Sequence, residues 1–80
     1  MHYLYVLKSV SKQRLYIGYS SNLRKRVLAH NGGSVASTKN FRPWQLIYYE
    51  AYSNESFAKD RERKLKQRGK AWQALKQRIS

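Results

Sequence analysis

Arginine, histidine and glutamate side chains fall at spacings that let a helix present them together. Arg26 and His30 are four positions apart in LRKRVLAHN, so a helix brings a cation and an imidazole within one turn of each other. Glu55 and Glu62 are seven positions apart in a later stretch, nearly in register along the border of its inward face. These side chains can neutralise an anion, move a proton and hold a hard cation.

Each of these residues also has a structural interpretation, which the residues alone leave open. Arg26 can extend its aliphatic stem over the core, and His30 can be a packed, hydrogen-bonded histidine. Glu55 and Glu62 can be surface acids that pair with Lys59 or Lys66 and add little stability. The seven tyrosines fall in strand-like segments, where most are expected to pack in the sheet.

Charge limits the kind of partner and the kind of metal site. Seventeen Lys and Arg oppose four Asp and Glu in 80 residues, for a formal net charge of +13. Such a surface attracts polyanions, so nucleic acid is the expected partner. The first acidic residue is Glu50, so a metal site must draw on the second half of the chain, where four carboxylates are too few for a two-metal cluster and one hard cation held by one carboxylate and water remains possible.

Length and composition indicate one small domain over residues 1–80, with a shallow site open to a polymer. The chain has no Cys, which excludes disulfides, thiolate zinc sites and cysteine nucleophiles. It has no long apolar run and no secretory leader pattern. We therefore expect a cytoplasmic protein, with association with the nucleoid left open.

Residue patterns predict six elements. Residues 3–8 and 14–19 have strand composition and predict a hairpin, with Gly18 marking a bulge or a close approach. A helix is predicted near residues 22–30, ended by Gly32 and Gly33, and residues 31–44 are expected to form a long functional loop.

Residues 45–52 return to strand composition, and Ser53 or Asn54 can cap a second helix. That helix is expected to turn an inward stripe of Phe57, Arg61 and Leu65 to the sheet. After Gly69, a short amphipathic helix is predicted to bury Trp72, Leu75 and Ile79. The fold class is α/β of the α+β type, a three-stranded antiparallel sheet flanked by helices in the order ββαβαα.

Two short tyrosine motifs carry a family resemblance. Tyr3-Leu4-Tyr5 and Tyr16-Ile17-Gly18 are separated by eleven positions from Tyr5 to Tyr16, Arg26 and His30 follow in SNLRKRVLAH, and Glu62 lies in AKDRERKLK. In this order and spacing the chain resembles the GIY-YIG nucleases over nearly its whole length, most closely the small stand-alone bacterial members. It departs from the family pattern at Tyr3, which replaces a glycine, and in WQALKQ, which lacks an asparagine that some members have.

The resemblance implies a metal-dependent endonuclease that hydrolyses phosphodiester bonds in DNA and serves repair or recombination. Glu62 would hold one Mg²⁺ or Mn²⁺, and Arg26 would stabilise charge on the phosphate. Tyr16 would deprotonate or orient the attacking water, with Tyr5 completing the site and His30 sharing the proton handling. Because tyrosine titrates near 10, activity is expected to rise with pH.

Basic and aromatic side chains around these motifs are the expected contacts to DNA, whether duplex, single-stranded or branched. They are Tyr19, Arg24, Lys25, Lys39, Arg42, Trp44 and Lys66. Two other functions stay open: a nucleic-acid-binding module of GIY-YIG fold with little or no cleavage, and a structural RNA-associated protein.

Overall fold

The computed structural model describes residues 1–79 and has the element order predicted from the sequence, ββαβαα. The strands are β1 (His2–Ser9), β2 (Leu15–Ser20) and β3 (Trp44–Tyr52). The helices are α1 (Leu23–Gly32), α2 (Glu55–Lys66) and α3 (Lys70–Ile79), with a short 3₁₀ helix η1 (Lys39–Phe41) before β3. The α+β class and the three-stranded antiparallel sheet are confirmed.

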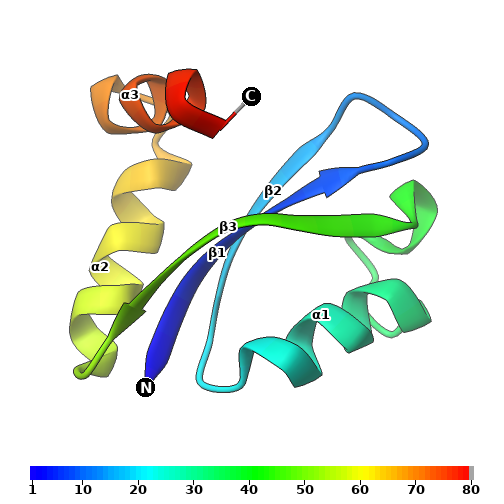
Figure 1. Ribbon diagram of the computed structural model, residues 1–80, viewed down its shortest axis with the longest axis horizontal. Coiled ribbons are helices and arrows are strands. Elements are labelled where there is room, and N and C mark those ends of the chain that lie inside the picture. The colour runs from blue at the N-terminus through cyan, green and yellow to red at the C-terminus, as the bar shows by residue number, and fades with distance from the viewer. Residues whose placement is uncertain (80) are drawn as a thin grey trace.

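β1 is the central strand of the sheet, whose order is β2-β1-β3 (Figure 1). Both neighbours run antiparallel to it, and Tyr5 pairs with Gly18 on β2 and with Tyr49 on β3. Because side chains alternate between the faces of a strand, Tyr5 and Leu7 point to one face while Leu4 and Val6 point to the other.

Helices cover both faces of the sheet, α2 and α3 on one and α1 on the other (Figure 1). The first layer buries Leu4, Val6 and Ile17 against Leu65, Trp72 and Leu75. The second layer buries Tyr5, Leu7 and Trp44, with half-buried side chains of α1 packed against them. The sheet therefore holds a tyrosine-bearing face next to α1.

Short polar caps begin both long helices. The Asn22 side chain accepts a hydrogen bond from the Lys25 backbone N–H at the start of α1, and Gly33 ends that helix in the left-handed conformation, with φ of 83°. The Asn54 side chain accepts from the Ser56 N–H at the start of α2, so Asn54 and not Ser53 is the cap. The predicted boundaries of α1 were short by two residues, because the helix continues to Gly32.

The inward stripe predicted for α2 was wrong at Phe57, which is 61% exposed. Ala58 and Leu65 are the buried positions, with Arg61 and Glu62 half-buried between them. The buried stripe thus begins at Ala58 in place of Phe57 and still includes Leu65 as predicted. The loop predicted over residues 31–44 is also shorter, because Asn31 and Gly32 belong to α1 and residues 39–41 form η1.

Candidate active site

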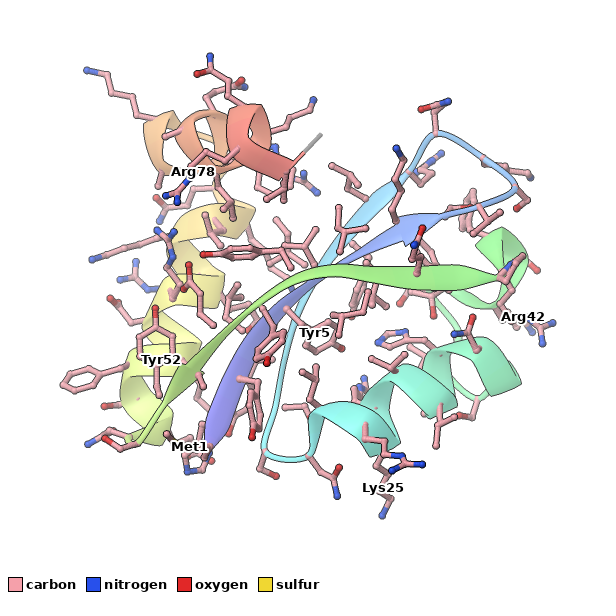
Figure 2. The ribbon with its side chains drawn as sticks, viewed as in Figure 1. Met1, Tyr5, Lys25, Arg42, Tyr52 and Arg78 are labelled. Atoms are coloured by element: carbon pink, nitrogen blue, oxygen red, sulfur yellow. The ribbon has the colours of Figure 1, made fainter. Side chains whose placement is uncertain are left out.

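A buried chain of three side chains begins the candidate site. The Tyr5 hydroxyl lies 2.7 Å from His30 Nε2, and His30 Nδ1 lies 2.8 Å from Thr38 Oγ1. Tyr5 is 1% exposed and the other two are fully buried. In Figure 2, Tyr5 lies between the sheet and α1. A strand, a helix and the loop that precedes η1 thus meet at one imidazole.

The hydrogen-bond pattern assigns the proton on His30. The Thr38 hydroxyl donates to the Val35 carbonyl oxygen at 3.4 Å, so its oxygen accepts from Nδ1–H. Nε2 is then an acceptor, and the Tyr5 hydroxyl donates to it. Burial, with a smaller contribution from the charge of Arg26, lowers the pKa of His30 to about 4, so the ring is neutral near pH 7.

Gly18 gives Tyr5 its position. A Cβ on Gly18 would lie 2.9 Å from Cε1 of the Tyr5 ring, and closer still to Cζ and the hydroxyl. The strand pairing puts these two residues directly opposite each other, so only glycine lets the ring lie across β2 and reach His30. The sequence-based expectation of a close approach at Gly18 is confirmed.

Tyr16 and Arg26 adjoin this chain on its more open side. The Tyr16 ring centroid lies 4.9 Å from that of His30 and 6.3 Å from that of Tyr5. The Arg26 guanidinium lies against both tyrosine hydroxyls, and its contact with Tyr5 raises the pKa of Arg26. Burial raises the pKa of Tyr5 to about 12, although the neighbouring Arg26 opposes that rise. Tyr5 therefore keeps its proton at neutral pH.

Glu62 and Lys66 approach from α2, on the opposite side of β2 from α1. Lys66 Nζ lies 3.2 Å from the Glu62 carboxylate and 5.8 Å from the centroid of the Tyr16 ring. The charge of Glu62 is also felt at Tyr5, as a minor cause of its raised pKa. The structure therefore brings Tyr5, Tyr16, Arg26 and His30 into contact, and Glu62 lies near enough for its charge to act on Tyr5 and for its partner Lys66 to lie over the Tyr16 ring.

Both border glutamates also form the ion pairs with lysine that the sequence allowed. Glu55 pairs with Lys59 at 3.3 Å, and Glu62 pairs with Lys66 at 3.2 Å, each one helical turn apart. The two pairs differ in exposure. The Glu55 side chain is more than half exposed, whereas the Glu62 side chain is 25% exposed and its partner Lys66 lies over the Tyr16 ring. Of these two glutamates, only Glu62 is partly buried and close to the candidate site.

The donor set around Glu62 suits one hard cation. Residues 1–79 contain no group of three or more His, Asp or Glu that could hold a metal. Glu62 offers a partly exposed carboxylate paired with Lys66, and Mg²⁺ commonly takes one or two carboxylates together with water and substrate phosphate. These residues therefore fit a single ion that is completed by substrate.

The expected nucleic-acid contacts are spread around the site. Arg24, Lys25 and Lys39 are exposed, and Lys25 points away from α1 into solvent (Figure 2). Arg42 is exposed, with its Nε donating to the Lys39 carbonyl oxygen at 2.7 Å. Tyr19 donates to Glu55 at 2.6 Å beneath the Lys59 ammonium, so its hydroxyl is occupied.

Trp44 does not fit the expected role of stacking on bases. Its side chain is 6% exposed, and its indole N–H donates to the Thr38 carbonyl oxygen at 2.9 Å. The ring packs between Tyr16 and Phe41, with centroids 6.2 and 6.4 Å away. Trp44 is therefore a core residue at the start of β3. Its ring packs against Tyr16, and its indole N–H holds the loop that carries Thr38.

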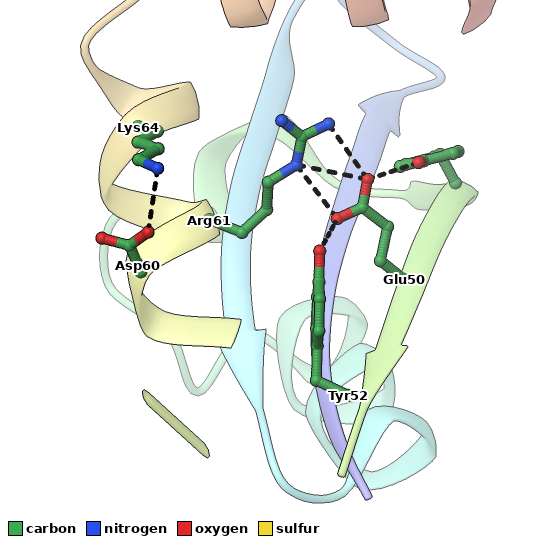
Figure 3. Close-up of polar contacts among 6 residues, drawn as sticks. Glu50, Tyr52, Asp60, Arg61 and Lys64 are labelled. Carbon is green, nitrogen blue, oxygen red and sulfur yellow. Dashed lines mark hydrogen bonds and ion pairs between the residues drawn. The ribbon is translucent and has the colours of Figure 1, made fainter. Parts of the chain in front are cut away.

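Two polar groups of consequence were not identified from the sequence. Thr38 lies in a loop without periodicity, where no local signal marks it as the partner of His30. Glu50 accepts from Arg61 on α2 at 3.0 Å and from the hydroxyls of Tyr48 and Tyr52 (Figure 3). An isolated acid on a tyrosine-rich strand was the signal that could have identified Glu50. Its contact with Arg61 joins β3 to α2 at the residue that precedes Glu62.

The fold and this site define a small basic α+β domain that carries a tyrosine, arginine and glutamate site at the edge of a three-stranded sheet. Residues 1–78 match the model of the GIY-YIG catalytic domain, and the chain belongs to this nuclease family.

Similar proteins are small bacterial chains. The chain is 41% identical over 63 residues to a UPF0213 protein of Clostridium perfringens, covering 78% of this chain and 67% of that protein. It is also 41% identical over 66 residues to a UPF0213 protein of Staphylococcus saprophyticus, covering 81% and 79%. No solved structure is significantly similar. No helix within residues 1–79 is long and apolar enough to cross a membrane.

Proposed function

We propose that this protein is a metal-dependent endonuclease that hydrolyses phosphodiester bonds in DNA. The observation that carries the proposal is the contact among Tyr5, Tyr16, Arg26 and His30, with Glu62 near enough for its charge to act on Tyr5. The net charge of +13 supplies the attraction for a polyanionic substrate. Cytoplasmic DNA repair or recombination is the cellular role that fits such an activity.

The surroundings of the two tyrosines separate their roles. Tyr5 is buried, holds its proton with a pKa of about 12 and donates to His30, so it is suited to orienting other groups. Tyr16 is half-buried beside Arg26 and Lys66, where it can meet a water and a phosphate. We assign to Tyr16 the orientation of the attacking water and, in its phenolate form, the uptake of the proton that the water loses.

The remaining residues handle charge and protons. Arg26 would stabilise the negative charge that develops on the phosphate, as a guanidinium does in other phosphoryl-transfer sites. Glu62 would hold one Mg²⁺ or Mn²⁺, which when bound would polarise the phosphate and help the departing oxygen. His30, neutral and accepting from the Tyr5 hydroxyl, would share in proton handling by holding that hydroxyl in place.

The test is cleavage of labelled duplex, single-stranded and branched DNA with Mg²⁺, Mn²⁺ or EDTA. Glu62→Ala and Arg26→Ala are expected to lower the rate by about 100-fold or more, as removal of one charge-stabilising group does elsewhere. Glu55→Ala is the matched control, because it also breaks a glutamate–lysine pair one turn apart on α2. Its rate should stay within about threefold of wild type.

Cleavage that survives chelation, or that Glu55→Ala reduces as much as Glu62→Ala, would overturn this site assignment. Absence of cleavage on every substrate, together with tight salt-sensitive binding, would instead identify a GIY-YIG fold that serves as a nucleic-acid-binding module. Preference for structured RNA, with indifference to both active-site substitutions, would indicate an RNA-associated protein.

A further inference from the structure

The buried chain of Tyr5, His30 and Thr38 ends against a cation. The Arg26 guanidinium lies against the Tyr5 hydroxyl. An arginine side chain carries only N–H donors and keeps its proton in proteins, so it offers no acceptor. The Tyr5 oxygen must therefore accept at this end, and its one hydroxyl proton is left for His30 Nε2, which lies 2.7 Å away.

The same direction passes through the imidazole to the loop before η1. Because Nε2 accepts from Tyr5 and the ring is neutral, the ring proton sits on Nδ1. Thr38 Oγ1, at 2.8 Å, is the acceptor for that proton. The Thr38 hydroxyl proton is then left for the Val35 carbonyl oxygen, at 3.4 Å. Every donor in the chain thus points away from Arg26 and toward the loop.

Loss of the Thr38 oxygen would reverse this direction. A buried N–H without an acceptor is unfavourable, so the ring would shift to the tautomer with its proton on Nε2. That N–H would donate to the Tyr5 oxygen, and the Tyr5 proton would turn toward a guanidinium that cannot accept it. Arg26 would lose its acceptor, although residue 38 does not touch it.

Thr38 is held precisely for a residue of a loop. It is fully buried, and the Trp44 indole N–H donates to its carbonyl oxygen at 2.9 Å. Its own backbone N–H donates to the Val35 carbonyl oxygen at 3.1 Å. The branched Cβ of threonine also restricts the rotation of its side chain. The backbone and the side chain therefore both keep the Thr38 hydroxyl beside His30.

We propose that Thr38 is a positioning residue of the candidate active site. By accepting from His30 Nδ1, it fixes the His30 tautomer, turns the lone pairs of the Tyr5 hydroxyl toward Arg26 and keeps the guanidinium in place for a phosphate. A third group that holds an imidazole in one tautomer has this kind of effect in other active sites. The inference rests on the proposed function in one respect, namely that Arg26 acts on the phosphate that is cut.

The first test is the tautomer of His30, read from the ¹⁵N resonances of the ring near neutral pH. The sequence has one other histidine, His2, so the spectrum of His30→Gln assigns the signals. We expect the proton on Nδ1 in the wild type and in Thr38→Ser, whose hydroxyl can still accept. Thr38→Val has a similar shape but lacks the oxygen, and most of its molecules should carry the proton on Nε2.

Cleavage kinetics test the consequence at Arg26. Thr38→Val should lower kcat by about 10-fold to 100-fold, as loss of a group that orients an active-site side chain commonly does. Its KM should change by less than about twofold, since Arg26 acts on charge that develops in the transition state. Thr38→Ser should cut within about threefold of the wild-type rate, because it keeps the acceptor.

Ser9→Ala is the matched structural control. The Ser9 hydroxyl is also buried, and it donates to the Phe41 carbonyl oxygen at 2.6 Å, so it fixes the same stretch of chain before β3. Its loss should lower the melting temperature, as Thr38→Val should. The His30 proton should nevertheless stay on Nδ1, and kcat should stay within about threefold of wild type, because this hydroxyl lies outside the chain that leads to Arg26.

Tyr5→Phe removes the oxygen through which Thr38 is inferred to act. Both substitutions break one chain, so adding Thr38→Val to Tyr5→Phe should slow cleavage by less than about threefold more. Independent losses that multiply in the double variant would overturn the inference, because Thr38 would then act by another route.

The remaining outcomes separate this inference from the proposed function. A wild-type His30 that carries its proton on Nε2 would overturn the inference whether or not Thr38→Val folds. So would a Thr38→Val protein that keeps the proton on Nδ1, or one whose kcat falls no further than that of Ser9→Ala. A wild-type protein that cuts no DNA but shows the expected tautomers would remove the proposed function and establish the direction of the chain. A protein that cuts, and cuts equally well as Thr38→Val, would remove this inference alone.

Discussion

Acidification should weaken folding through His30 before any carboxylate titrates. His30 is fully buried and neutral, and burial lowers its pKa from an ordinary value of 6.5 to about 4. The unfolded chain therefore binds a proton as the pH falls through 6.5, whereas the folded protein does not until about pH 4. The stability contributed by the neutral ring is present above 6.5 and is progressively lost between these two values.

The magnitude follows from the two pKa values. Between pH 7 and pH 5 the linkage relation gives a loss of about 2 kcal/mol in the free energy of unfolding. A domain of this length is expected to have about 4–12 kcal/mol in total, so the loss is measurable. The pKa values of Glu50, Glu55 and Asp60 are all held below their ordinary range, so their contributions are lost only at lower pH.

The assay is urea unfolding at several pH values from 7.5 to 5, followed by tryptophan fluorescence. His30→Gln is the matched control, since its amide can accept from Tyr5 and donate to Thr38 but does not titrate. The control should show a nearly flat dependence over this range. A wild-type protein whose stability is equally flat, or a His30 ring that titrates near pH 6.5 by NMR, would refute the assignment of a buried neutral imidazole.

Two other substitutions test parts of the fold that hold the site. Gly18→Ala would drive a methyl group into the Tyr5 ring, so thermal unfolding should show a loss of about 1–3 kcal/mol and cleavage should fall with it; a stable and active variant would contradict the close approach. Glu50→Gln leaves Arg61 without its carboxylate and should cost about 1–3 kcal/mol, whereas Asp60→Asn, which breaks only exposed pairs, should cost less than about 1 kcal/mol in the same urea measurement.

Local sequence was sufficient for the elements of this fold but not for all of their faces. Strand-like segments and the glycine stop after α1 act within a few residues and are found where they were predicted, and Asn54 is the one of the two predicted candidates that caps α2. In α2, the inward residue of the first turn depends on which side chain fits against the sheet. Phe57 and Ala58 differ by one position, and packing placed the smaller residue inside.

The candidate site shows the same division. Arg26, His30 and Glu62 could be named because helical spacing and the family pattern both mark them. Thr38 could not, because it reaches His30 from a loop whose path is decided by Trp44 and Asn31: the Asn31 side chain hydrogen-bonds both the N–H and the carbonyl oxygen of Trp44. Trp44 was wrongly expected to contact bases, because nothing in the local sequence indicates that the loop before it folds over its ring.

Strand register explains why Tyr5, out of seven tyrosines, can donate to His30. Tyr3 and Tyr5 share a face of β1, but Tyr3 stands opposite Ser20 and packs edge-on against Tyr49, whereas Tyr5 stands opposite Gly18. The missing side chain at Gly18 leaves room for the Tyr5 ring to extend across β2 toward His30. A shift of one residue in the pairing of β1 and β2 would place Ile17 or Tyr19 opposite Tyr5 in place of Gly18, and a side chain would then stand where the ring now passes. The chemistry proposed for this site therefore depends on the register of β1 and β2 as directly as on the identity of its side chains.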